Sequence, residues 1–255
     1  MSILSLCTDL GLTDFSVGAA KGLIAKLVPQ AKVIDISHNV MPFNLNEAAY
    51  FIRNSYPNFP EKSIHIIDVG AGLNTIGTIL AIEHNEQFFI APDNGLLPLI
   101  FDTKNIAAVE LKGCKPSLNP LMEFMIPAAT KLYKSPKLKS IGEEAHKIQE
   151  KISLKAVVTS DLIRGFVIYV DVYGNLITNI LKEDFDRIKA NRECTISFRR
   201  SDVISTISRL YNDVTTGERL SLFGKAGHLE IAINEGKANE LLGLKIGDTI
   251  TCDFS

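Results

Sequence analysis

Short apolar runs that end abruptly in polar residues set the pattern of the first half of the chain. The runs cover residues 3–7, 31–37, 63–69 and 106–111, and residues 75–82 and 87–91 form a further pair across a polar turn. Residues 15–28, 45–55, 121–133 and 141–151 are compatible with helices. Strands that alternate with helices are typical of α/β domains, so we expect a central, mostly parallel sheet.

The pattern changes near Gly165, where helical stretches give way to short β-type runs. These runs cover residues 165–172, 194–198, 228–233 and 249–254, and turns rich in Gly and Asn separate them. Short strands of this kind are typical of a small barrel or sandwich. We therefore predict an N-terminal α/β domain over residues 1–155 and a smaller, mainly β domain over residues 160–255.

The composition excludes several classes of function. The formal net charge of −2 over 255 residues gives no basic field for nucleic acid. The apolar runs are shorter than the about 20 residues that a membrane span needs. The chain starts with a strand and not with a leader, which predicts a cytoplasmic protein. Four scattered cysteines without CxxC spacing indicate reduced thiols and no zinc site, and the lack of GxGxxG gives no support for a nicotinamide cofactor.

The loop after the first run carries the first candidate site. Asp9 follows the predicted strand directly, and Asp14 and Ser16 lie at the start of the predicted helix. Ligands of open α/β sheets bind at the carboxyl ends of strands. Two carboxylates and a hydroxyl suit a ligand with hydroxyls and a cationic group, and they would repel a phosphate. The alternative is that Asp14 only caps the helix.

The next two loops repeat this arrangement. His38 follows the second strand, and it is either a ligand-binding group or a residue hydrogen-bonded to loop backbone. Phe43 is either a hydrophobic staple of the next helix or an aromatic wall for a ligand. Asp68 ends the third strand before a Gly-x-Gly turn, where backbone can approach a ligand closely. It is a candidate site residue, or it satisfies turn amides. Asn94 follows another strand and can face the same crevice.

The second half has one strong candidate motif, residues 171–179, with the sequence DVYGNLITN. Asp171, Tyr173 and Asn175 offer an acceptor, an aromatic face and an amide, which suits the reading of a nucleobase. The alternative is a hairpin turn around Gly174 and Asn175.

Six segments in this order resemble the S-adenosylmethionine hydroxide adenosyltransferases, a family that also contains fluorinases and chlorinases. The segments are TDLGLTDFSVGAAKG, VIDISHNVMPFN, IHIIDVGAG, FFIAPDNGLL, DVYGNLITN and GHLEIAINEGKANELLGLKIGD. The resemblance implies an N-terminal α/β domain, a C-terminal β-barrel domain and a homotrimer with sites at subunit interfaces. It implies displacement at the ribose 5′ carbon of S-adenosylmethionine, which gives adenosine and methionine when water attacks. No further cofactor is implied.

The resemblance also implies roles for individual residues. Asp9 corresponds to the carboxylate on the ribose hydroxyls, Phe43 to the aromatic against the sugar, and Asp68 to the acid that activates water. Asp14, Ser16 and Asp171 correspond to residues near the methionine end. Tyr173 and Asn175 correspond to the aromatic and the amide that hold the adenine. Asp68 also disfavours a halide nucleophile, because a carboxylate repels an entering anion.

The chain departs from the family pattern at three places. The arginine and histidine that accompany the acid in hydrolytic members fall on Thr75 and Pro120, and an Asn-Ser pair falls on Gly224 and Lys225. Lys225 is a candidate replacement for the missing cation. We expect an S-adenosylmethionine hydrolase. The alternatives are a binding protein that has lost catalysis, and an enzyme with another nucleophile or nucleoside.

Overall fold

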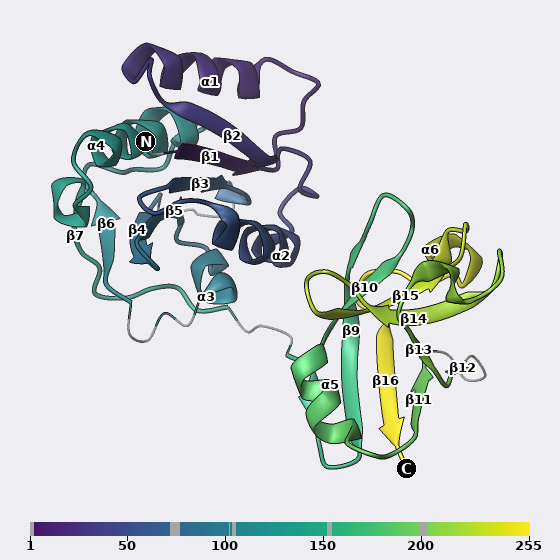
Figure 1. The fold of residues 1–255 in the computed structure, drawn as a ribbon. Coiled ribbons are helices and arrows are strands. Elements are labelled where there is room, and N and C mark those ends of the chain that lie inside the picture. Colours follow the sequence, from purple (N-terminus) through teal and green to yellow (C-terminus); the bar gives the residue numbers. More distant parts are fainter. Residues whose placement is uncertain (1–2, 72–76, 102, 104–105, 152–154, 199–202) are drawn as a thin grey trace. The chain divides into compact units, whose positions relative to one another are not determined.

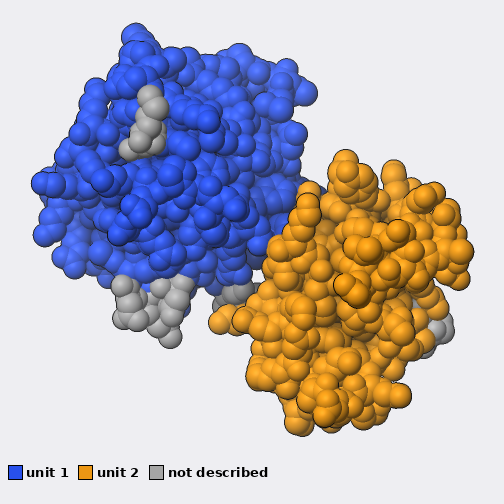
Figure 2. Space-filling view, in the orientation of Figure 1, with its two compact units in different colours: residues 1–153 blue, residues 154–255 orange. Residues whose placement is uncertain are grey.

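The computed structural model describes residues 3–71, 77–101, 103, 106–151, 155–198 and 203–255 (Figure 1). The chain forms two compact units, residues 1–153 (unit 1) and residues 154–255 (unit 2), which Figure 2 distinguishes by colour. The predicted domain boundaries at 155 and 160 stay a prediction, because compactness does not show that either unit folds alone.

The described residues of unit 1 form a seven-stranded sheet in the order β2-β1-β3-β5-β4-β6-β7. The strands are β1 (Ile3–Thr8), β2 (Lys32–Ser37), β3 (Ile64–Asp68), β4 (Ile79–His84), β5 (Gln87–Pro92), β6 (Ala108–Leu111) and β7 (Gly142–Glu144). The four strands β2, β1, β3 and β5 pair in parallel, and every pairing beyond β5 is antiparallel. The sheet is therefore mixed and not mostly parallel, because from β5 onward each strand runs opposite to its neighbour in the sheet.

Helices cover both faces of this sheet (Figure 1). Alternating residues of β1 point to opposite sides, so Leu4 packs with α1 (Ser16–Leu27) and α4 (Ile126–Lys134), while Cys7 packs with α2 (Leu45–Ser55) and α3 (Leu96–Ile100). The short helical turns are η1 (Tyr56–Asn58), η4 (Leu121–Met125) and η5 (Leu138–Ser140). Burial on both faces explains the continuous apolar runs of the sequence, and it leaves the strand ends as the place for polar groups.

The predicted helix over residues 141–151 is wrong. Residues 142–144 form β7, which pairs with β6, and residues 145–151 are neither helix nor strand. Gly142 lies so close to β6 that an added Cβ would come within 2.3 Å of the carbonyl oxygen of Glu110. Pairing with β6 outweighs the helical preference of the charged residues that follow, because local propensity is a weak determinant.

The described residues of unit 2 form a nine-stranded sheet in the order β12-β11-β16-β9-β10-β15-β14-β13, with β8 paired to β9. The strands are β8 (Val157–Val158), β9 (Leu162–Val170), β10 (Leu176–Leu181), β11 (Cys194–Ser197), β12 (Val203–Ile204), β13 (Ile207–Ser208), β14 (Arg219–Phe223), β15 (His228–Ile233) and β16 (Thr249–Phe254). In the described residues no strand pairing joins β12 to β13, so the sheet is a curled half-barrel, and the closed barrel stays a prediction.

Two helices and a helical turn complete unit 2: α5 (Lys182–Lys189), α6 (Ala238–Leu241) and η6 (Tyr211–Asp213). Phe185 of α5 is buried, and its ring lies 5.1 Å from that of Phe223 and 5.2 Å from that of Phe254. The helix thereby covers the apolar face of the sheet. The motif of residues 171–179 spans the turn between β9 and β10 and the start of β10, with Val172 and Tyr173 exposed and residues 174–178 buried.

Candidate functional site

Asp9 joins three strand-end segments of unit 1. Its Oδ2 accepts hydrogen bonds from the backbone N–H of Phe43 at 2.9 Å and of Gly70 at 3.0 Å. Its own N–H donates to the carbonyl oxygen of Asp68 at 3.4 Å. The ends of β1 and β3 and the loop after β2 therefore meet at one carboxylate, as expected for the carboxyl ends of parallel strands.

Asp68 is a buried carboxyl group at the end of β3. It is 5% exposed, and among the described residues its Oδ1 has no hydrogen-bond partner. Burial, together with the negative charge of Asp9, raises the pKa of Asp68 to about 7. A carboxyl group that titrates near neutral pH can accept a proton from water, and such shifted groups concentrate at functional sites.

Phe43 combines exposure with an unusual backbone conformation. Its φ is 65°, in the left-handed region that bulky residues rarely adopt, and its side chain is 57% exposed. The hydrogen bond from its N–H to Asp9 and the one from Leu45 N–H to its carbonyl hold this conformation. An exposed ring does not act as a hydrophobic staple, so the geometry favours the aromatic wall.

Asp14 and Ser16 form a local pair at the start of α1. The Oδ1 of the exposed Asp14 accepts the N–H of Ser16 at 2.8 Å. One carboxylate oxygen therefore holds the turn that leads into α1, although the N-cap residue is Phe15 and not Asp14, so capping by Asp14 is not what the structure shows. The role of both residues at the methionine end stays a prediction.

Asn94 supports the turn that follows Asp68. Its Nδ2 donates to the carbonyl oxygens of Val69 at 3.0 Å and Gly70 at 3.2 Å, and its Oδ1 accepts the N–H of Leu96 at 3.2 Å. Both ends of this buried amide have partners, so the structure shows a residue that orients the turn. Direct contact with a ligand stays a prediction.

Two of the departures from the family pattern, Thr75 and Pro120, fall in unit 1. Thr75 lies outside the described residues. Pro120 directly precedes η4 and offers no ionisable side chain.

Unit 2 holds its acidic candidate in a single turn. The Oδ1 of Asp171 accepts the N–H of Tyr173 at 2.9 Å and of Asn175 at 2.8 Å, and its Oδ2 accepts the Asn175 side-chain amide at 3.0 Å. The hairpin turn predicted as the alternative is therefore present. It also brings the predicted acceptor, aromatic face and amide to one place.

This turn lines a cavity of about 700 Å³ in unit 2. Its lining residues are Asp171, Val172, Tyr173, Asn175, Tyr211, Lys225, Ile233, Glu235, Gly236 and Lys237. Sequence reasoning missed Tyr211, which no periodic pattern marks. Its hydroxyl donates to the Oε2 of the buried Glu230 at 2.8 Å, and burial raises the pKa of that carboxyl. The cavity thus presents two tyrosine rings, an amide and groups of both charges.

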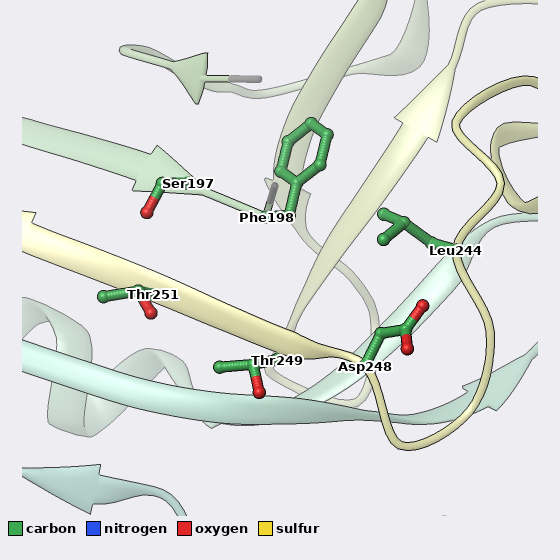
Figure 3. A pocket seen from close by; sticks show the side chains of 6 residues that line it. All are labelled: Ser197, Phe198, Leu244, Asp248, Thr249 and Thr251. Carbon is green, nitrogen blue, oxygen red and sulfur yellow. The ribbon is translucent and has the colours of Figure 1, made fainter. Parts of the chain in front are cut away.

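A second hollow of unit 2 is less suited to a nucleoside. It measures about 430 Å³ and is lined by Ser197, Phe198, Leu244, Asp248, Thr249 and Thr251 (Figure 3). Phe198 is buried, and the Oδ2 of Asp248 accepts the N–H of Lys245 at 2.9 Å. The hollow therefore presents hydroxyl groups without an exposed aromatic face on which a base could stack.

Two searches of the described residues bear on other classes of site. No group of three or more His, Cys, Asp or Glu side chains in that part of the chain is placed to hold a metal ion. In the same residues, no helix combines the length and apolarity needed to cross a membrane.

The sequence matches two family models. Residues 4–142 match the SAM hydroxide adenosyltransferase N-terminal domain, and residues 165–251 match the C-terminal domain of the same family. The chain therefore belongs to the SAM hydroxide adenosyltransferase family.

Curated relatives cover nearly all of the chain. An (R)-S-adenosyl-L-methionine hydrolase of Methanocaldococcus jannaschii is 27% identical and covers 98% of this chain and 95% of its own. One of Thermus thermophilus is 28% identical, with 94% and 95% covered. A fluorinase of an Actinoplanes species is 23% identical, with 98% and 96% covered. The crystal structure of an uncharacterized conserved protein from Thermotoga maritima matches with a TM-score of 0.88 and 28% identity, covering 98% of this chain and all of that one.

Proposed function

We propose that the protein hydrolyses S-adenosyl-L-methionine to adenosine and L-methionine by attack of water at the ribose 5′ carbon. The family and the relatives named as (R)-S-adenosyl-L-methionine hydrolases support this reaction. The structural observation that carries it is the buried Asp68 carboxyl, whose Oδ1 has no hydrogen-bond partner in the described part of the chain and whose pKa is raised to about 7 by burial and by the charge of Asp9. Such a group can take a proton from the attacking water.

In this reaction water displaces the leaving group directly, and the protein itself only accepts a proton. The oxygen of water forms a bond to C5′, and the C5′–S bond breaks with its electron pair passing to sulfur. The sulfonium becomes the neutral thioether of methionine, and the proton of the water passes to Asp68. The leaving group is activated by its own positive charge, so alignment of water with C5′ and sulfur is the main requirement.

The Asp68 carboxylate also disfavours a halide as the nucleophile, the reaction that the name of the fluorinase relative denotes. A halide would have to enter next to Asp68 and Asp9, and two carboxylates in a poorly solvated site repel an anion. Water has no charge and meets no such barrier. Water is therefore the nucleophile that this site favours.

Binding is assigned to the remaining candidate residues. Asp9 and Phe43 bind the ribose, and Tyr173 and Asn175 hold the adenine. The amino-acid end of the substrate contacts Asp14, Ser16 and Asp171. Lys225 lines the same cavity as Asn175 and is the candidate replacement for the arginine that the family has at Thr75. The reaction needs no cofactor, so dialysis against a chelator should leave it unchanged.

We further propose a cytoplasmic homotrimer in which each site combines residues from two subunits. Mixing two variants tests the shared site at a substrate concentration far below KM, where a lost catalytic group and weakened binding both lower the rate. Asp68→Asn and Asn175→Ala subunits that are unfolded together and refolded should regain activity, since some sites then receive both intact residues. No recovery in trimers that contain both variants would contradict a shared site.

The reaction itself is tested with purified protein and each sulfonium epimer of S-adenosyl-L-methionine. Adenosine and methionine should form in equal amounts over many turnovers, faster from the (R) form that names the relatives. The Asp68→Asn variant is the control for contaminating activity. If the ligand raises the melting temperature but no adenosine forms, the protein is a binding protein and the proposal is wrong.

A further inference from the structure

A connected set of polar groups lies behind Asp9, outside the residues that the proposed reaction uses. It begins with Lys21 of α1, whose Nζ lies 2.5 Å from the Oδ2 of Asp35 in β2. The Oδ1 of Asp35 lies 3.1 Å from the Nε2 of His38, and the Nδ1 of His38 lies 2.9 Å from the Oγ1 of Thr8. Thr8 is the last residue of β1 and directly precedes Asp9.

The direction of the hydrogen bonds follows from this order. Among the described residues Nε2 of His38 has no aligned hydrogen bond, but the Asp35 carboxylate 3.1 Å away favours by its charge the tautomer with the proton on Nε2. Nδ1 is then an acceptor, so the Thr8 hydroxyl donates to it. The lone pairs of Thr8 Oγ1 remain available to the N–H of Leu10, which lies 3.4 Å away. The side chain of His38 thereby fixes the hydroxyl that holds the residue after Asp9.

The main chain of His38 holds the same loop at a second point. Its carbonyl oxygen accepts the N–H of Gly11 at 2.7 Å. Thr8 and His38 are 0% and 4% exposed, so water does not compete for these contacts. Asp9 lies between Thr8 and Gly11, and both flanking residues are bonded to His38.

We propose that His38 is a positioning residue, which holds the loop of residues 8–11 so that the Asp9 carboxylate meets the ribose hydroxyls of the substrate. This inference rests on the proposed function, because binding of the ribose by Asp9 is part of that function. It extends that function by naming what sets the carboxylate in place. It also resolves the two interpretations of His38, since the ring is bonded within the loop network and acts on the ligand only through Asp9.

The test uses two nucleosides that differ only in the hydroxyls concerned. Dissociation constants are measured by calorimetry for adenosine and for 2′,3′-dideoxyadenosine. Their ratio reports the recognition of the ribose hydroxyls, and a general loss of folding or of base binding leaves it unchanged. In the wild-type protein we expect a ratio of about ten or more, as for hydrogen bonds to a charged group.

Two matched pairs of variants separate positioning from structure. Thr8→Val removes the hydroxyl at nearly constant volume, and Thr8→Ser restores it. His38→Asn keeps a polar group near the position of Nδ1, whereas His38→Gln places it near Nε2. We expect Thr8→Val and His38→Gln to lower the ratio about fivefold, with Thr8→Ser and His38→Asn within about twofold of the wild type. The exposed His146→Asn serves as the control histidine.

A further variant asks whether the network acts through Asp9. Asp9→Asn should bring the ratio close to one, and adding Thr8→Val should lower it no further, because both changes remove the same interaction. A wild-type ratio in a well-folded Thr8→Val protein would overturn the proposal, as would a wild-type ratio near one. Failure of hydrolysis would be distinct, since a protein that binds adenosine without forming it from S-adenosylmethionine still gives both constants.

Discussion

Asp9 in unit 1 and Asp171 in unit 2 both accept two backbone hydrogen bonds, but from very different distances along the chain. The donors to Asp9 are Phe43 and Gly70, which are 34 and 61 residues away. The donors to Asp171 are Tyr173 and Asn175, within four residues. The geometry around Asp9 therefore depends on the whole sheet, and the geometry around Asp171 depends on a single turn.

The candidate acid of unit 1 and the candidate aromatic ring of unit 2 differ in their exposure to solvent. Asp68 of unit 1 is 5% exposed, whereas Tyr173 of unit 2 is 74% exposed. A buried, sheet-held carboxyl suits a chemical step, because its proton affinity is set by its surroundings. An exposed ring beside a cavity suits recognition. The comparison predicts that unit 1 governs turnover and unit 2 governs affinity.

The strongest test of this division is the Asp68→Asn variant. An amide cannot accept the proton of the attacking water, so kcat should fall about a thousandfold, while the dissociation constant for adenosine stays within about threefold. Steady-state kinetics and calorimetry measure the two quantities. The matched change in unit 2, Asn175→Ala, should act mainly on binding. If Asp68→Asn weakened binding and left kcat unchanged, the division between the units would be wrong.

The pH profile sharpens the role of Asp68. Only the ionised carboxylate accepts a proton. Burial, with a smaller effect of the negative charge of Asp9, raises the pKa of Asp68 to about 7. We therefore expect kcat/KM to rise about tenfold per pH unit below about pH 6 and to level off above about pH 8, a change of about fiftyfold between pH 5 and 7. Initial rates in buffers of constant ionic strength test this. A flat profile between pH 5 and 8 would remove Asp68 as the base.

Two of the buried titratable groups of unit 1, His65 and Asp68, have opposing effects on stability. Burial lowers the pKa of His65 to about 4, although its hydrogen bond with Gln87 raises it in part. His65 therefore contributes stability above its unfolded pKa of about 6.5, which is lost as the pH falls towards 4. Asp68 has a raised pKa, so its contribution is present below about pH 4 and is lost as the pH rises through about 7.

Two variants separate these effects. Between pH 7 and 5, the stability advantage of wild type over His65→Gln should shrink by about 2 kcal/mol. The advantage of Asp68→Asn over wild type should shrink by a similar amount, about 2 kcal/mol, so the wild-type curve is nearly flat. Urea unfolding at both pH values measures each difference. If the difference in unfolding free energy between wild type and one of these variants were the same at both pH values, the assigned burial of the replaced group would be wrong.

The sequence predicts the local features of both units. The apolar runs end at Asp9 and Asp68 because strands buried on both faces leave polar groups only at their ends. The Asp171 turn is equally clear, because its acceptor and donors lie within four residues. The structure places Asp9 directly after β1, Asp68 at the end of β3 and Asp171 in the turn before β10, and their roles in a site stay predictions.

The remaining features depend on contacts between distant residues. The amide of Asn94 is committed to Val69 and Gly70, which its own neighbours do not reveal. Tyr211 reaches the cavity of Asp171 from a part of the chain with no periodic pattern. The positive φ of Phe43 runs against the preference of a bulky residue and is held by hydrogen bonds of its N–H to Asp9 and of its carbonyl oxygen with Leu45 N–H. Sequence reasoning weighs local preference, so it misses such non-local effects.

The smallest expected effect concerns the ring of Tyr173. If unit 2 contributes recognition through an aromatic face, Tyr173→Ala should weaken adenosine binding about fivefold, because stacking of a base on an aromatic ring is lost. Tyr173→Phe keeps the ring and should stay within about twofold of wild type, and kcat should change little in either variant. Calorimetry with adenosine and initial rates at saturating substrate provide the two readings. If Tyr173→Phe were as weak as Tyr173→Ala, the hydroxyl and not the ring would be the binding group, and the assignment of Tyr173 as a stacking surface would be wrong.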